Sequence, residues 1–211
     1  MNKDLYNNDW INIDGNAIHK TAVIHPNVKL GKGNIIGAFC VIGSNGEIRG
    51  KDFNEFEGTV HIGNNNVISE HVTIQRPFEK GKSTVIGDRN LIMAHVHIGH
   101  DAFIANDCEI CTSSVIGGYV TIYDKAKIKL NCTVRNRLIV GSEAVIGMGS
   151  VVTRSVPNFA VVYGNPAKQK EVETVAQSVI GGAVLPEKTK AILFWGAVLV
   201  VGIVGLIWSL S

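Results

Sequence analysis

The sequence has few aromatic residues, few charges and no strong excess of either sign. Of its 211 residues, 7% are aromatic and 18% are charged, with 20 basic against 18 acidic side chains. A net charge of +2 gives no electrostatic reason to expect nucleic acid as a partner. Leucine is scarce before residue 180, whereas glycine, valine and isoleucine are abundant. This composition disfavours a helical bundle and favours short strands joined by tight corners.

Cysteine is also scarce, and the four residues are spread along the chain: Cys40, Cys108, Cys111 and Cys132. The first ten residues, MNKDLYNNDW, hold no apolar run typical of a signal peptide, so we expect a reducing compartment. Cys108 and Cys111 form one C-x-x-C pair without a second pair. Structural cysteines are therefore expected, with zinc as the weaker alternative.

Charge is absent from residues 191–211, AILFWGAVLVVGIVGLIWSLS. A helix of this length, at ~1.5 Å per residue, spans about the ~30 Å of a bilayer core. Trp195 and Trp208 stand near its two ends, and Lys188 and Lys190 precede it. We therefore expect a C-terminal transmembrane helix that anchors a cytoplasmic catalytic body to a membrane. The alternative is an apolar helix buried within an oligomer.

Large aliphatic residues recur every six positions. They fall at Ile18, Ile24, Leu30, Ile36 and Ile42, then at Ile62, Ile68 and Ile74, and then in twelve consecutive hexads from Ile86 to Val152. Four residues after the aliphatic the side chain is often small, as at Cys40, Ala102, Cys108 and Cys132. A six-residue period with one large and one small inward position predicts an all-β fold, a parallel β-helix in which three hexads close one coil. Residues 18 apart should then stack, and the hydrogen bonds between coils should follow the ~4.8 Å strand spacing.

The pattern divides the chain into four segments: an N-terminal segment 1–16, a β-helix 17–166, a helix or linker 167–190 and the transmembrane helix 191–211. Two polar, glycine-containing interruptions break the register, SNGEIRGKDFNEFEG after Ile42 and QRPFEKGKST after Ile74. Loops carried on a rigid scaffold commonly bind ligands, so both are candidate substrate loops.

Three histidines, His95, His97 and His100, lie within six residues. His100 follows Ile98 by two positions, so we expect it at a corner, pointing outward, with Gly118 one coil further along. A histidine base beside a backbone N–H that stabilises an oxyanion is a pair suited to acyl transfer. Asp101, Tyr119 and Arg137 should form the neighbouring column. A zinc site of the carbonic anhydrase type, formed by His71, His95 and His100, stays open as an alternative, as does a non-catalytic trimeric scaffold.

Basic residues follow in the later coils, with Lys125, Lys127 and Lys129 alternating before Arg135 and Arg137. We expect this strip to be continuous with the polar corner. It would either receive the phosphates of coenzyme A or an acidic carrier protein, or remain a solvated face.

At these residues the chain resembles the bacterial UDP-N-acetylglucosamine O-acyltransferases, hexapeptide-repeat enzymes that begin lipid A synthesis. The resemblance covers about residues 17–166 and is closest from VHIG at residue 60 to HDAF at residue 103. It implies a left-handed winding, a homotrimer with sites between subunits, no metal and no bound cofactor, His100 as general base and the Gly118 amide as oxyanion donor. It also implies sugar-nucleotide contacts from His97, Gln75, Asp52 and Tyr119.

The chain departs from that family at several positions. Gln75 and Tyr119 stand where the family has histidine, and Arg135 and Asn136 stand where it has His-Gln. The ending SVVTRSVPNFAVVYGNPAK resembles acetyl-CoA-dependent hexapeptide transferases. Donor contacts are expected from Arg135, Asn136, Met148 and Lys168, with Met148 as the floor that shortens the acyl groove.

The resulting prediction is an acyltransferase that moves an acyl group from coenzyme A or acyl carrier protein to a hydroxyl or amine of a sugar nucleotide. The acyl group is expected to be acetyl, with a longer hydroxyacyl chain of the lipid A type as the alternative.

Overall fold

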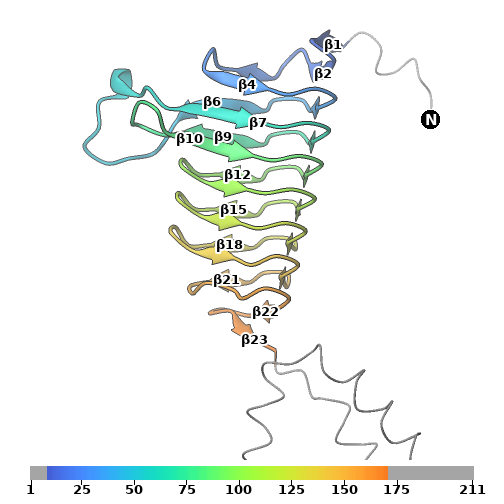
Figure 1. Ribbon diagram of the computed structural model, residues 1–211, viewed down its shortest axis with the longest axis vertical. Coiled ribbons are helices and arrows are strands. Elements are labelled where there is room, and N and C mark those ends of the chain that lie inside the picture. Colours follow the sequence, from blue (N-terminus) through green and yellow to red (C-terminus); the bar gives the residue numbers. More distant parts are fainter. Residues whose placement is uncertain (1–8, 171–211) are drawn as a thin grey trace, which may run out of the picture. The chain divides into compact units, whose positions relative to one another are not determined.

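The structure is a computed structural model that describes residues 9–170, and within this range the chain forms a parallel β-helix (Figure 1). Short strands follow one another around a three-sided prism, and each coil contributes one strand to each of three sheets. No residue between 9 and 170 lies in an α-helix. The predicted all-β repeat fold is thereby confirmed.

We name the three sides sheets A, B and C. Sheet A contains β1 (Trp10–Ile13), β2 (Asn16–His19), β5 (Ile35–Ile36), β8 (Val67–Ile68), β11 (Leu91–Ile92), β14 (Glu109–Ile110), β17 (Lys127–Ile128), β20 (Val145–Ile146), β22 (Val161–Tyr163) and β23 (Lys168–Gln169). Sheet B contains β3 (Val23–Ile24), β6 (Val41–Asn45), β9 (Thr73–Arg76), β12 (His97–Ile98), β15 (Val115–Ile116), β18 (Thr133–Val134) and β21 (Val151–Val152). Sheet C contains β4 (Val28–Leu30), β7 (Thr59–Ile62), β10 (Ser83–Ile86), β13 (Phe103–Ile104), β16 (Thr121–Ile122) and β19 (Ile139–Val140).

The two ends of sheet A are antiparallel. β1 pairs with β2 at one end, and β23 pairs with β22 at the other. β1 belongs to the segment expected to precede the β-helix, and β23 belongs to the segment expected to be a linker. Residues 171–190, the rest of that expected linker, lie outside the described residues.

The register between coils follows the predicted 18-residue spacing. Ile86 pairs with Ile104, and Ile104 pairs with Ile122. Backbone amides of one coil donate to carbonyls of the next, as from Gly99 N to Ile116 O at 2.8 Å. From Ile86 to Val152 a side chain at a corner therefore has its neighbour fixed 18 residues along, whereas the two loops lengthen the offset before Ile86, as from Ile62 to Ile86.

Stacked isoleucines fill the interior of the prism. Those almost wholly excluded from solvent include Ile36, Ile42, Ile68, Ile74, Ile86, Ile92, Ile98, Ile104, Ile110, Ile116, Ile122, Ile128 and Ile146. The small inward positions are also buried, including Cys40, Cys108 and Cys132. The predicted division into large and small inward positions is confirmed for these residues.

A ladder of buried asparagines, which the sequence analysis missed, runs along the bend from sheet C to sheet A. Asn34 N and Nδ2 both donate to Asn16 Oδ1 at 2.9 Å, and Asn66 and Asn90 repeat the pattern one coil at a time. Asn66 Nδ2 also donates to the Gly87 carbonyl at 2.9 Å. Each side chain therefore satisfies backbone groups that the bend would otherwise leave buried without partners.

Both sequence interruptions lie at the bend from sheet B to sheet C, which we call the B–C corner. The first loop, 46–58, joins β6 to β7 and carries the 3-10 helix η2 (Phe53–Glu55); the second, 77–82, joins β9 to β10. They project from the same side of the stack (Figure 1). Phe56 and Phe78 meet edge to face at 5.1 Å, and Glu57 N donates to Phe78 O at 3.0 Å. The two loops thus support one another.

The predicted membrane location is corrected. Among residues 9–170 no helix is long and apolar enough to cross a membrane. The span 191–211, on which that prediction rested, lies outside the described residues.

The asparagine ladder makes a stability prediction. We expect Asn66→Ala to destabilise the fold by at least ~2 kcal/mol, because it leaves the Gly87 carbonyl and the Asn90 amide buried without partners, at ~1–3 kcal/mol each. Urea unfolding measures the change, with Asn54→Ala, an exposed loop substitution, as the control. Equal unfolding midpoints for the two variants would show that the ladder is not a stabilising element.

Candidate active site

His100 and Asp101 form an ordered pair at the B–C corner, directly after β12. His100 Nδ1 lies 2.8 Å from Asp101 Oδ2, and the two side chains are 15% and 13% exposed. The carboxylate holds the proton on Nδ1, so the lone pair of the neutral ring is on Nε2. The pair therefore presents Nε2 as a base of defined orientation.

Gly118 occupies the predicted place one coil along. Tyr119 N donates to His100 O at 2.9 Å, and a Cβ added at Gly118 would lie 2.9 Å from His100 Nε2. A side chain at position 118 would therefore collide with the His100 ring. Within residues 9–170, the Gly118 amide donates to no protein acceptor. A proton acceptor and an available backbone donor thus lie side by side, as acyl transfer requires.

The neighbouring column also forms as predicted. The Tyr119 ring meets the His100 ring edge to face at 5.1 Å, and the Arg137 guanidinium lies 4.2 Å above the Tyr119 ring. Arg135 and Asn136 are exposed at the same corner, one coil beyond Gly118. The corner is therefore lined by polar side chains from successive coils.

His97 and Gln75 lie on sheet B beside this corner. His97 Nδ1 is 2.8 Å from Thr73 Oγ1. Burial lowers the pKa of His97, while the Glu47 carboxylate opposes this effect and His100 adds to it, so a neutral His97 is expected at pH 7. Gln75 is almost fully buried and follows Ile74, which pairs with Ile98 immediately before Gly99. Both predicted substrate residues are therefore close in register to His100.

Asp52 lies in the loop 46–58 and is exposed. Its Oδ1 accepts a hydrogen bond from Asn54 N at 2.8 Å, which starts the 3-10 helix η2. The same carboxylate retains a free oxygen toward solvent on the side of the prism where His100 lies. The prediction that it contacts substrate stays a prediction.

Thr84 is a residue of this site that the sequence analysis did not find. Its side chain is fully buried; Oγ1 accepts from Asp101 N at 2.9 Å and donates to Gln75 O at 2.7 Å. The hydroxyl thus joins the backbone of Asp101, whose carboxylate orients His100, to the strand that carries Gln75. A threonine between Ser83 and Val85 in a strand gives no signal of such a bond.

Met148 does not lie at the B–C corner of its own chain. It lies at the bend from sheet A to sheet B, between β20 and β21, and is 71% exposed. Within one chain Met148 is therefore separated from His100, because successive hexads turn onto different sides of the prism, and its expected role as the floor of an acyl groove stays a prediction. Only a second subunit could bring it to the site.

The predicted continuous basic strip is also wrong. Lys127 lies on sheet A and Lys125 at the bend from sheet C to sheet A, across the prism from Arg135 and Arg137. Lys129 Nζ pairs with Glu109 Oε1 at 2.7 Å. The residues that alternate in sequence are distributed over different sides because each coil turns three times.

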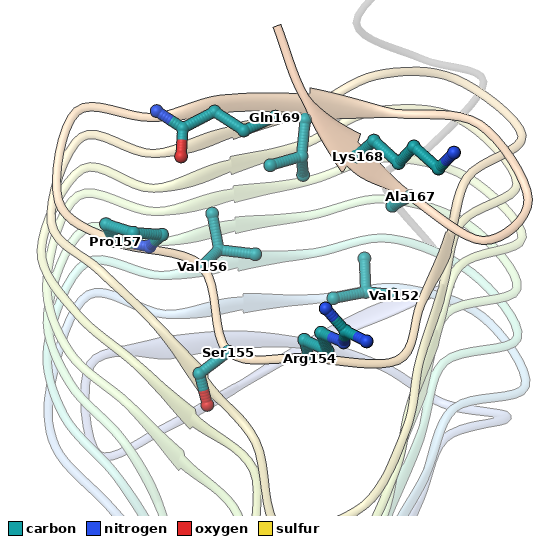
Figure 2. A pocket seen from close by; sticks show the side chains of 9 residues that line it. Val152, Arg154, Ser155, Val156, Pro157, Ala167, Lys168 and Gln169 are labelled. Atoms are coloured by element: carbon teal, nitrogen blue, oxygen red, sulfur yellow. The ribbon is translucent and has the colours of Figure 1, made fainter.

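Lys168 borders a pocket of about 380 Å³ at the C-terminal end of the prism (Figure 2). Val152, Val156 and Ala167 form apolar walls, and Arg154 and Lys168 reach over its rim. Both cations are exposed. Arg154 belongs to the same corner as His100, three coils further along.

The histidines of the zinc alternative are not brought together. His71 and His95 stack at 4.7 Å on the bend from sheet A to sheet B, with Phe39 stacked below His71. His100 lies at the next bend. Between residues 9 and 170 no group of three metal-ligating side chains is found, so no observation favours the carbonic anhydrase alternative.

The cysteines fit a structural role. All four are buried and free. Burial raises the pKa of Cys40 and Cys108 to about 11, so both stay protonated at neutral pH. Protonated thiols are poor nucleophiles and poor zinc ligands.

The chain is similar to curated acyltransferases. It is 36% identical over 153 residues to the acyl-[acyl-carrier-protein]–UDP-N-acetylglucosamine O-acyltransferase of Synechocystis, covering 72% of this chain and 55% of the relative. The protein of that name from Stutzerimonas stutzeri is 41% identical over 112 residues, 53% of this chain and 43% of the relative. The chain thus spans about half the length of these curated relatives. No family model matches it.

Solved structures give the same result. A UDP-N-acetylglucosamine acyltransferase from Bacteroides fragilis superposes with a TM-score of 0.72 at 30% identity, covering 81% of this chain and 66% of that one. The Arabidopsis UDP-N-acetylglucosamine acyltransferase gives a TM-score of 0.63 at 26% identity, with 77% of each chain covered. The β-helix described above is the fold of these enzymes.

The buried hydroxyl of Thr84 allows a test of how Asp101 is held. We expect Thr84→Val to lower kcat for acyl transfer by about 10-fold, because a displaced Asp101 no longer orients His100. Thr121→Val is the control, since the Thr121 hydroxyl makes no hydrogen bond within the described part of the chain. If both variants keep full activity, the bond from Thr84 to Asp101 does not serve the site.

Proposed function

Because this chain belongs to the hexapeptide-repeat acyltransferase family that includes the UDP-N-acetylglucosamine O-acyltransferases, we propose that it transfers an acyl group from a thioester to a hydroxyl of a sugar nucleotide. The supporting observation is the contact between His100 and Gly118, where an oriented base lies beside a free backbone amide. UDP-N-acetylglucosamine is the acceptor to test first, since the relatives carry its name.

In this proposal His100 Nε2 accepts the proton of the acceptor hydroxyl as its oxygen attacks the thioester carbonyl. The carbonyl oxygen becomes an oxyanion and accepts the hydrogen bond that the Gly118 amide donates. Collapse of the tetrahedral intermediate forms the new ester and breaks the carbon–sulfur bond, and the departing thiolate takes the proton from His100. Asp101 stabilises the imidazolium between these steps. The base and the oxyanion donor both come from the chain, so the reaction needs no bound cofactor.

The acceptor is proposed to lie between the loop 46–58 and the polar corner. His97, Gln75 and Tyr119 lie on the corner side and Asp52 on the loop side. A neutral His97 suits hydrogen bonding to a sugar hydroxyl in either direction, since one ring nitrogen donates and the other accepts. The carboxylate of Asp52 accepts hydrogen bonds from sugar hydroxyls.

The donor is proposed to be a thioester of acyl carrier protein or coenzyme A. Arg135 and Asn136 lie on the same corner, one coil beyond Gly118, and Arg154 and Lys168 follow at the C-terminal pocket. Cations suit the phosphate of a pantetheine arm and the acidic surface of a carrier protein.

We also propose that the active assembly is a homotrimer with sites between subunits. The loop 46–58 gives the acceptor one wall beside the corner, but one prism leaves the corner beyond Gly118 without an opposite wall, and a bound acyl chain needs a concave site. A second prism placed against the corner would supply the other wall and could bring Met148 to the acyl chain.

The central experiment replaces His100. We expect His100→Ala to lower turnover of UDP-N-acetylglucosamine with acyl carrier protein thioesters or acyl-CoA by at least ~10²-fold, because general-base assistance is worth about 10²–10⁴. Mass spectrometry of the acylated product measures turnover. His95→Ala is the matched control, a corner histidine on a different side of the prism. If both variants fold and their turnover is equal, His100 has no catalytic role.

The acyl-chain length of the preferred donor tests whether Met148 of a second subunit lines the site. We expect the native chain to prefer acetyl over hydroxyacyl donors of about 10 to 14 carbons, and Met148→Gly to shift this preference toward long donors, since overlap in a filled groove costs typically 1–3 kcal/mol. Competition between the two donor classes measures the preference. Because Met148 lies at another corner of its own chain, a shift also requires that a second subunit lines the site. An unchanged preference would place Met148 outside the groove.

A further inference from the structure

Gly46, the first residue of the loop 46–58, lies against the ring of His100. A Cβ added at Gly46 would be 2.8 Å from His100 Cβ and 2.9 Å from Cγ and Cδ2. Real Cβ atoms do not approach other atoms this closely, so a side chain at position 46 would force the loop or the ring to move. Gly46 is buried, and no sequence pattern had distinguished it from the other glycines of the loop.

The two glycines that touch His100 contact different parts of its ring. Gly46 lies at the carbon edge, and Gly118 lies at Nε2 and Cε1. Asp101 occupies Nδ1 at 2.8 Å. Rotation of the imidazole is thus opposed on the carbon side by the loop and on the Nδ1 side by the carboxylate, which leaves Nε2 directed to Gly118.

Hydrogen bonds fix the base of the loop 46–58. The contact between Gly46 and the His100 ring therefore does not depend on the conformation of the rest of the loop. Gly46 N donates to Arg76 O at 3.1 Å. Asn45 Oδ1 accepts from Arg76 Nε at 2.8 Å, and Asn45 Nδ2 donates to Phe53 O at 2.6 Å. The two bonds to Arg76 join the base of the loop to β9, the strand that pairs with the strand of His97 in sheet B, and the bond to Phe53 closes the loop on its own base.

We propose that Gly46 is a positioning residue for His100: its missing side chain lets the base of the loop 46–58 close on the imidazole and hold Nε2 beside Gly118. The loop then has two roles, as a wall of the acceptor site and as the support of the base. This inference rests on the proposed acyl transfer for its kinetic consequence, but not for its structural one.

The test compares Gly46→Ala with Gly50→Ala. Gly50 lies in the same loop, has φ of 79° and has no atom within 4 Å of an added Cβ. Its substitution therefore strains the loop backbone without touching His100. We expect Gly46→Ala to lower kcat by at least about 10-fold with KM changed by less than about threefold, because displacement of a catalytic group by about 1 Å has effects up to 10²-fold. Gly50→Ala should keep kcat within about threefold of the native chain.

Nuclear magnetic resonance of the imidazole supplies a readout that does not need activity. Gly46→Ala should shift the ring signals of His100, assigned by their loss in His100→Ala, and Gly50→Ala should leave them in place. Native signals in Gly46→Ala, or equal effects of both glycine substitutions on kcat, would overturn the proposal. If His100→Ala keeps native turnover, the proposed function fails, and the ring signals still decide the positioning role.

A second variant covers the case in which Gly46→Ala does not fold. Asn45→Ala removes two hydrogen bonds at the base of the loop and adds no atom near His100. It should lower kcat several-fold and broaden or shift the same ring signals. Unchanged kcat together with unchanged signals would overturn the proposal independently.

Discussion

The rest of the molecule depends on the backbone hydrogen bonds between coils, which hold paired strands about 4.8 Å apart. Ile98 pairs with Ile116, so the residues two positions later, His100 and Gly118, meet at the same corner. No side-chain interaction is needed to bring them together. A rigid stack of coils therefore aligns a base in one hexad with a backbone donor 18 residues away, without a mobile loop between them.

The chemistry at this corner depends as much on missing side chains as on those present. Gly118 admits the ring of His100 next to its backbone, and Gly46 admits the loop against the other edge of the ring. The residues that bend at the same level, Asp101 and Tyr119, adopt φ of 58° and 61° although neither is glycine. That conformation costs about 1–2 kcal/mol per residue, and the hydrogen bonds and packing of the stack must offset it. The stacked coils thus hold the residues of the site in place.

The three bends of the prism carry different chemistry, although their residues alternate along the chain. The bend from sheet C to sheet A holds the asparagine ladder, the bend from A to B holds the stacked rings of Phe39, His71 and His95, and the B–C corner holds His100 and both loops. Side chains close in sequence, such as His95 and His100, therefore belong to different surfaces. This is why the lysines after Asp124 do not extend the polar corner and why no zinc site forms from the histidine-rich segment.

The repeat fold, the 18-residue register and the pairing of His100 with Gly118 could all be predicted from the sequence alone, because a strict six-residue period leaves one way to stack the coils. Sequence could not reveal Thr84 or Gly46, since a buried threonine in a strand and a glycine in a loop look ordinary until the neighbouring coil is in place. The six-residue phase also does not say which subunit completes a site, so the place of Met148 at an acyl groove stays a prediction. Only the tertiary structure decided the places of Thr84 and Gly46, since their contacts with Gln75, Asp101 and His100 join residues 9, 17 and 54 positions apart.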